Sequence, residues 1–190
     1  MTAGLILAAG ESRRMGFPKA LLRYRGETFL DRLTTLLALH CSPVIVVVGA
    51  DADEIRSAAC GPATFVINRD WQRGQTSSLQ CGLAAVPPEA DGVLFTLVDH
   101  PAVDGATIET LLSSQQPLLR IPRYQFRRGH PIWFSRTLIP EFLSLAEPLT
   151  AKDVVHAHTG ETQFLDLDDP GIVADIDDPA AYRALTGAVL

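Results

Sequence analysis

The chain opens with an apolar segment that leads directly into a glycine-containing basic loop. Residues 4–9 carry no charge, as expected for a buried strand of a parallel sheet, and Gly10 permits a tight turn immediately after it. Backbone N–H groups in such a turn form a concavity that binds anions, and three side chains add positive charge: Arg13, Arg14 and Lys19. The segment therefore predicts a strand that ends in a phosphate-binding loop.

Two common phosphate loops differ from this segment. The Walker loop has Gly-Lys-Ser/Thr in direct succession, whereas Phe17 and Pro18 separate Gly16 from Lys19. The dinucleotide fingerprint has Gly-x-Gly-x-x-Gly, whereas Gly10 is followed by glutamate and serine. A structural turn with basic surface residues is the simpler alternative, but a strand, two glycines and a lysine at this spacing favour a ligand-binding loop of a third kind.

The apolar pattern alternates between strands and helices along the first half of the chain. We expect buried strands at 44–48, 65–67 and 93–98, and helices at 29–37, 51–59 and 79–85, the last capped by the Ser/Thr residues of 75–78. This alternation is typical of an α/β sheet with right-handed crossovers. The sequence predicts a Rossmann-like three-layer α/β/α sandwich with a mostly parallel central sheet, formed by residues 1–190 as a single domain.

Three aspartates are candidates for a metal site. Ligands of such sheets bind beyond the carboxyl ends of the strands, and Asp99 directly follows the strand expected at 93–98. Magnesium in nucleotide sites is held by one or two carboxylates together with substrate phosphates, but an aspartate at this place also commonly caps a turn or helix. Asp175 and Asp177 would face the same side of an extended segment. They could equally belong to a solvated turn in which Asp177 or Asp178 caps the last helix.

Charge and hydropathy exclude several classes of partner. The formal net charge of −6 argues against general nucleic-acid binding, which needs a basic surface. No apolar run approaches the roughly 20 residues of a membrane span, and no basic region precedes the first apolar segment as in a signal peptide. We therefore expect a cytoplasmic protein without a membrane or nucleic-acid partner. Basic residues concentrate near 13–25 and 120–128, which suits small anionic ligands.

Four segments together carry a resemblance to a known family. Residues 7–19 read Leu-x-Ala-Gly-x-Ser-x-Arg-Met-Gly-x-x-Lys, and residues 97–101 read Leu-x-Asp-x-Pro. Residues 68–82 fit Asn-x-x-Trp-x-x-Gly-x-x-x-Ser-Leu-x-x-Gly, and residues 175–177 read Asp-Ile-Asp. The chain resembles the MobA-like nucleotidyltransferases, which activate a phosphorylated acceptor with a nucleoside triphosphate. Within them it is most similar to the molybdopterin cytidylyltransferase branch.

The resemblance implies a Mg²⁺-dependent transfer of CMP from CTP to molybdenum-loaded molybdopterin, with release of pyrophosphate, in molybdenum cofactor biosynthesis. It places catalysis on Lys19, Arg14 and Asp99, and the metal on Asp99 and Asp175. It implies nucleotide contacts from Leu7, Ala8, Ala9, Gly10, Arg14, Lys19 and Ser78. On the acceptor side it points to Arg128, Gly129, His130 and Asp177.

Several individual roles have a structural alternative. Trp71 is interpreted as a core anchor, and Ser78 as a helix cap that also contacts the ligand. His130 precedes a proline and is as readily a structural turn residue as a general base or phosphate donor. The acceptor loop matches the family less closely, because Phe126 stands where the family commonly has glycine.

The function also has alternatives. CTP is favoured because Ala9 matches the cytidylyltransferase form, whereas guanylyltransferase relatives tend to carry glycine there. A sugar phosphate or another small phosphorylated alcohol is the alternative acceptor, and a nucleotide-binding module without transferase activity is an alternative class. A hydride-transferring dinucleotide enzyme would need the missing glycine fingerprint. A molybdoenzyme or its chaperone would receive the product of the cytidylyltransferase.

Overall fold

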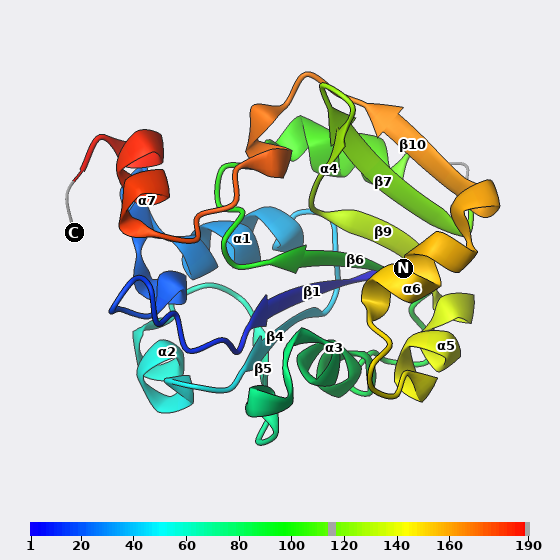
Figure 1. Ribbon diagram of the computed structural model, residues 1–190, viewed down its shortest axis with the longest axis horizontal. Helices are drawn as coiled ribbons and strands as arrows, with labels where there is room; N and C mark the ends of the chain where they lie inside the picture. Colours follow the sequence, from blue (N-terminus) through cyan, green and yellow to red (C-terminus); the bar gives the residue numbers. More distant parts are fainter. Residues whose placement is uncertain (114–116, 189–190) are drawn as a thin grey trace.

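The central sheet is mostly parallel and lies between two layers of helices. The computed structural model describes residues 1–113 and 117–188, and within them eight strands form this sheet in the order β10-β7-β9-β6-β1-β4-β5, with β8 beside β7 (Figure 1). The strands are β1 (Thr2–Ala8), β4 (Val44–Val48), β5 (Thr64–Ile67), β6 (Gly92–Leu97), β7 (Leu119–Tyr124), β8 (Arg127–Arg128), β9 (Ile132–Ser135) and β10 (Thr162–Asp166). A separate hairpin pairs β2 (Arg23–Tyr24) with β3 (Glu27–Thr28).

Strand β1 is the centre of the parallel part of the sheet. It pairs in parallel with β4 and β6, and β4 pairs in parallel with β5. Strand β9 runs antiparallel between β6 and β7, and β10 is again parallel to β7. The predicted Rossmann-like α/β architecture is confirmed, with β9 and the short β8 as its antiparallel members.

Alternate side chains of β1 enter two separate cores. Ile6 and Ala8 pack with the side chains of α1 and α4, whereas Leu5 and Leu7 pack with those of α3 and α5, since successive strand residues face opposite sides of a sheet. Figure 1 shows α1 and α4 on one side of the sheet and α3, α5 and α6 on the other. The helices are α1 (Phe29–Ala38), α2 (Ala52–Ala58), α3 (Gln75–Leu83), α4 (Gly105–Leu112), α5 (Ile139–Ser144), α6 (Ala151–Ala157) and α7 (Pro179–Thr186).

Helix α3 differs from the predicted helix at 79–85 in both its start and its cap. It begins at Gln75 and ends at Leu83, and Gly74 is its N-cap with φ +94°. Ser77 and Ser78 therefore lie inside the helix, and the prediction that the Ser/Thr run caps it is wrong. The reason is local, since glycine adopts a positive φ readily and starts the helix before the hydroxyl residues are reached.

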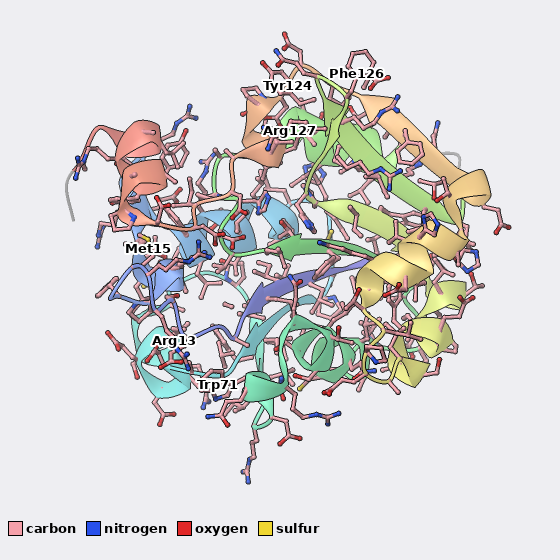
Figure 2. The ribbon with its side chains drawn as sticks, viewed as in Figure 1. Arg13, Met15, Trp71, Tyr124, Phe126 and Arg127 are labelled. Atoms are coloured by element: carbon pink, nitrogen blue, oxygen red, sulfur yellow. The ribbon has the colours of Figure 1, made fainter. Side chains whose placement is uncertain are left out.

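The second basic segment, residues 120–128, has two structural arginines and two exposed ones, Arg127 and Arg128. Arg120 is buried and donates hydrogen bonds to the carbonyl oxygens of Leu111 and Ser113 at the C-terminal end of α4, and Arg123 pairs with Asp166. Figure 2 shows Arg127 at the β7–β8 hairpin. Arg120 and Arg123 are therefore already engaged within the fold, and the prediction that this segment suits anionic ligands rests on Arg127 and Arg128. Within the described ranges, no helix combines the length and the apolar character needed to cross a membrane.

Candidate active site

The loop after β1 is held in place by its own serine and methionine. The backbone N–H of Met15 donates to the carbonyl oxygen of Ser12 at 2.9 Å, and the Ser12 hydroxyl accepts from the Lys19 N–H at 3.1 Å. Met15 is buried in the core, while the Arg13 side chain is exposed (Figure 2). The loop thereby turns its backbone and the Lys19 side chain toward the carboxyl end of the sheet.

This loop lines a first cavity of about 520 Å³. Trp71 forms part of the opposite wall, on the short 3₁₀ helix Trp71–Arg73. A Cβ atom on Gly49 would lie 2.5 Å from Trp71 Cβ, so the glycine permits the tryptophan to pack against the end of β4. Trp71 is thus half-buried against the core and also faces the cavity.

The structure brings the residues predicted for the nucleotide to one place. The first cavity is lined by Leu7, Ala8, Ala9, Gly10, Arg14, Lys19 and Ser78. Ser78 is buried, and its hydroxyl oxygen accepts a hydrogen bond from the Asn68 side-chain amide at 3.0 Å. The gathering of these residues around one cavity is a structural result, and their contact with a nucleotide stays a prediction.

Lys19 lies between two carboxylates at the floor of this cavity. Its Nζ is 3.2 Å from Asp99 Oδ2 and 2.5 Å from Asp177 Oδ1, and Arg14 Nη2 is 3.1 Å from Asp177 Oδ2. The hydrogen bond from Lys19 lowers the pKa of Asp177. Burial alone would raise the pKa of Asp99, but the hydrogen bond from His100 and the Lys19 charge outweigh it and lower the pKa. Asp177, predicted for the acceptor side, lies with the cations of the phosphate loop.

A cluster of metal-ligand types adjoins this ion pair. One donor atom each from Asp99, His100 and Asp175 lies within 4.8 Å of the others. Burial and then the charges of Asp99 and Asp177 raise the pKa of Asp175, so the ionised carboxylates repel one another here. A divalent cation would relieve that repulsion, and these oxygen donors fit Mg²⁺.

The structure also separates the roles of the C-terminal aspartates. Asp178 Oδ1 accepts a hydrogen bond from the Ala181 N–H at 2.8 Å, so Asp178 is the N-cap of α7. Ile176 is buried, and its N–H donates to the main-chain oxygen of Asp99 at 3.0 Å. This contact holds the 175–177 segment against the end of β6 and keeps the two flanking carboxylates near Asp99.

A second, larger cavity of about 1110 Å³ lies on the other side of the cluster. Its wall includes Arg128, Gly129 and His130, which were predicted for the acceptor, together with apolar side chains from several elements. Asp99 lines the first cavity, whereas His100 and Asp175 line the second. The cluster therefore stands at the junction of the two cavities.

His130 is fixed on the wall of the second cavity as a neutral imidazole. Burial and the neighbouring His100 lower its pKa to about 4, so it is uncharged near neutral pH. Its Nδ1 is buried without a hydrogen-bond partner in the described part of the chain. A Cβ atom on Gly129 would lie 2.3 Å from the carbonyl oxygen of Ile172, which explains the glycine before it.

His100 is the member of the cluster that sequence reasoning missed. It is buried, and its Nδ1 lies 3.0 Å from Asp99 Oδ1. The available signal was its position directly after Asp99 at the end of a strand, where imidazole is a common metal ligand.

Comparison with known proteins agrees with this arrangement. Residues 4–162 match the MobA-like NTP transferase domain. The chain belongs to this family of nucleotidyltransferases. The MobA-like protein also resembles the crystal structure of Rv0371c from Mycobacterium tuberculosis H37Rv, with a TM-score of 0.87 and 30% identity over 98% of each chain. The predicted family and enzyme class are confirmed.

The curated relatives of the MobA-like protein carry different names. It is 38% identical over 153 residues to the nicotine blue oxidoreductase of Paenarthrobacter nicotinovorans, which covers 74% of each sequence. It is 25% identical over 177 residues to the molybdenum cofactor cytidylyltransferase of Escherichia coli, with 92% of this chain and 90% of the relative covered. Membership of the family therefore does not by itself identify the substrates.

Proposed function

We propose that this MobA-like enzyme transfers CMP from CTP to the phosphate of molybdenum-loaded molybdopterin and releases pyrophosphate. The observation that carries the proposal is the position of the Asp99, His100 and Asp175 cluster at the junction of the two cavities. A triphosphate in the first cavity and an acceptor in the second would meet there. The E. coli relative named a molybdenum cofactor cytidylyltransferase supports the choice of substrates.

The chemistry is a displacement at phosphorus. An oxygen of the acceptor phosphate forms a bond to the α-phosphorus of CTP while the bond from that phosphorus to the α–β bridging oxygen breaks, and pyrophosphate leaves. Lys19 and Arg14 would exchange their carboxylate partners for phosphate oxygens and stabilise the charge that develops. A phosphate nucleophile needs no general base at neutral pH, which agrees with the low pKa of His130.

A divalent cation belongs to the proposal, and Mg²⁺ is the ion that the family resemblance implies. Asp99 and Asp175 would hold it, and when bound it would neutralise phosphate oxygens at the reacting centre. A structure of Rv0371c is a complex with manganese, and this chain is 29% identical to it over 99% of each chain with a TM-score of 0.75. That relative supports divalent-metal dependence here.

The second cavity suits an acceptor with both a ring system and a charged group. Its wall contains Phe95, Ile132 and Leu145 beside Arg128, and binding sites for organic ligands are mostly apolar with a few placed polar groups. A pterin that carries a phosphate fits this description. A sugar phosphate would leave the apolar side chains without contacts.

A second candidate function follows from the 38% identical relative named nicotine blue oxidoreductase. In it, a reduced nicotinamide would deliver a hydride to a heterocycle in the second cavity, a proton would complete the reduction, and the oxidised nicotinamide would leave. The dinucleotide phosphates would occupy the basic loop. The cation cluster has no role in that reaction, so we place it second.

The deciding experiment measures binding and turnover in sequence. We expect Mg²⁺-dependent binding with CTP preferred over GTP, ATP and UTP, weak binding by Lys19→Ala, and pyrophosphate release when molybdenum-loaded molybdopterin is added. Binding without pyrophosphate release would reject this acceptor, and sugar phosphates would be tested next. Absence of turnover with any acceptor would indicate a nucleotide-binding module.

A parallel assay separates the oxidoreductase. Nicotinamide absorbance would be followed with NADH or NADPH and nicotine blue, without a triphosphate. Oxidation of the nicotinamide together with no pyrophosphate release would replace the transferase proposal. If the transferase is confirmed, release of its product to a molybdoenzyme or chaperone is the next step to test.

A further inference from the structure

His100 is held rigidly inside the cluster of metal-ligand types. The residue is buried, with 6% of its surface exposed. Its Nδ1 lies 3.0 Å from Asp99 Oδ1, and its ring packs edge-on against that of His130 at 5.0 Å between centroids. A buried imidazole fixed beside two carboxylates is arranged as a ligand set rather than as a surface histidine.

The two oxygens of Asp99 face different partners. Oδ2 accepts from Lys19 on the side of the first cavity, and Oδ1 faces His100 on the side of the second. His100 and Asp175 both line the second cavity. A cation bound between Oδ1 and the imidazole would take the place of the proton that joins them. It would have a second carboxylate beside it and would not displace Lys19.

We infer that His100 is a nitrogen ligand of the cation and makes this site prefer Mn²⁺ to Mg²⁺. Mg²⁺ is bound almost entirely through oxygen. Mn²⁺ also takes carboxylate and water ligands, but it belongs to the first-row transition series, whose members accept imidazole nitrogen. Donors on opposite sides of an ion bound at about 2.1 Å lie about 4.2 Å apart. The donor atoms of Asp99, His100 and Asp175 lie within 4.8 Å of one another. Small side-chain rotations would therefore bring them to the spacing that a bound ion requires. The inference rests on the cation site of the proposed transferase and goes beyond it in assigning His100 and the preferred metal.

A second observation points to a bound group at the same place. His130 Nδ1 is buried and has no hydrogen-bond partner among the described residues, and His130 lines the second cavity with His100 and Asp175. Buried polar atoms are normally paired. A hydrated cation in the neighbouring cluster would bring polar groups into this part of the cavity.

The test uses metal ions alone, without nucleotide. Mn²⁺ binding would be titrated by the electron paramagnetic resonance signal of the free ion, with Mg²⁺ as competitor, on the wild type, His100→Asn and the control His40→Gln. Asparagine keeps a hydrogen-bond donor for Asp99 but removes the imidazole nitrogen. His40 is exposed and lies 4.0 Å from Glu109, so its replacement should not alter the cluster.

We expect the Mn²⁺ affinity of His100→Asn to fall by about 10-fold or more, as for other losses at metal sites, with a smaller change for Mg²⁺. Electron spin-echo spectra of bound Mn²⁺ should show nitrogen coupling in the wild type and in His40→Gln, and none in His100→Asn. Thermal unfolding would confirm that each variant is folded. Absence of nitrogen coupling in the wild type, or parallel losses for both ions, would overturn the inference and leave His100 as a positioning residue for Asp99.

Pyrophosphate release is measured separately so that the two proposals fail separately. Nitrogen coupling without any transferase activity would retain His100 as a ligand and reject the proposed function. Transferase activity without nitrogen coupling would support the proposed function and reject His100 as a ligand.

Discussion

The two cavities differ in how the chain builds them. The first takes about half of its lining from the single stretch 7–20, and the rest from α2, the 71–78 segment, the end of β6 and Asp177. The second takes its wall from α3, β6, β7, β9, α6 and the connection after α5. A binding site made by a continuous loop carries its pattern in the sequence, whereas a site made from six separated elements does not.

They also differ in the kind of ligand that they favour. The first combines a glycine-containing turn with Arg14 and Lys19, so charge dominates it. The second combines apolar side chains with a neutral His130 and has about twice the volume. This contrast indicates that phosphate recognition and acceptor recognition are separable, and each prediction below tests that separation.

The largest effect is expected for Lys19→Ala. Its Nζ is the cation nearest to both Asp99 and Asp177, and loss of one such fixed charge commonly lowers kcat by about 100- to 1000-fold. Pyrophosphate release at saturating CTP would measure it, with Arg183→Ala on α7 as a folded, charge-matched control. A rate near that of the wild type would show that the first cavity does not hold the reacting phosphates.

A matched pair of glycine variants separates the cavities directly. In Gly49→Ala the new Cβ would meet Trp71 at 2.5 Å, and in Gly129→Ala it would meet the Ile172 carbonyl oxygen at 2.3 Å. Overpacking commonly costs about 1–3 kcal/mol of stability. If about 1.4 kcal/mol of strain at the wall of a binding site is carried into the bound state, the affinity for the ligand falls tenfold. We expect Gly49→Ala to weaken CTP binding and Gly129→Ala to raise the acceptor KM, each leaving the other constant nearly unchanged.

Calorimetric CTP binding and steady-state kinetics with the acceptor would measure the pair, and circular dichroism would confirm folding. If both variants impaired both substrates equally, the cavities would be one coupled site and the comparison would fail.

Asp175→Asn tests the junction through stability. When the pKa of a carboxyl group is higher in the folded protein than in the unfolded chain, its protonated form favours folding. This stabilisation is fully present below the pKa of the unfolded chain and is lost as the pH rises through the pKa of the folded protein. Because the pKa of Asp175 is raised by burial and by Asp99 and Asp177, its ionised form destabilises the metal-free protein at neutral pH. We therefore expect Asp175→Asn to melt at a higher temperature than the wild type without metal.

The same variant should lose most of the stabilisation that a divalent cation gives the wild type. Differential scanning fluorimetry with and without Mg²⁺ or Mn²⁺ would measure both effects. A lower melting temperature in the absence of metal would contradict the repulsion inferred here.

The smallest effect is expected behind the second cavity, at His158. Its ring nitrogens lie 2.9 Å from Glu161 Oε2 and 2.8 Å from Glu141 Oε2, and these hydrogen bonds raise its pKa. The stabilisation is fully present below the ordinary pKa of 6.5 and is lost as the pH rises through the raised folded value. We expect His158→Gln to lower the free energy of unfolding by about 0.2–1 kcal/mol at acid pH, with a vanishing difference at alkaline pH and unchanged CTP binding. Urea unfolding across pH would measure it.

Much of the fold could be predicted because its signals are local. The strands predicted at 44–48 and 93–98 consist of apolar residues apart from Thr96, and their predicted bounds lie within one residue of β4 and β6. The start of α3 could not be placed, because it depends on the positive φ of Gly74 rather than on the Ser/Thr run. The role of Arg120 was also hidden, since a buried arginine that donates to main-chain oxygens at the C-terminal end of α4 looks like a surface cation in sequence.

For the site, the sequence by itself determined the phosphate loop, because its turn, charge and spacing all lie within residues 7–19. It also determined which aspartates were candidates. Only the tertiary structure decided that Asp178 caps α7 while Asp177 pairs with Lys19, and that His100 joins Asp99 and Asp175. The physical reason is that Asp177 meets Lys19 across 158 positions of the chain, and Asp175 meets the end of β6 across more than 70. The packing of Ile176 against the core holds the segment that carries both aspartates, which leaves Asp178 to cap α7.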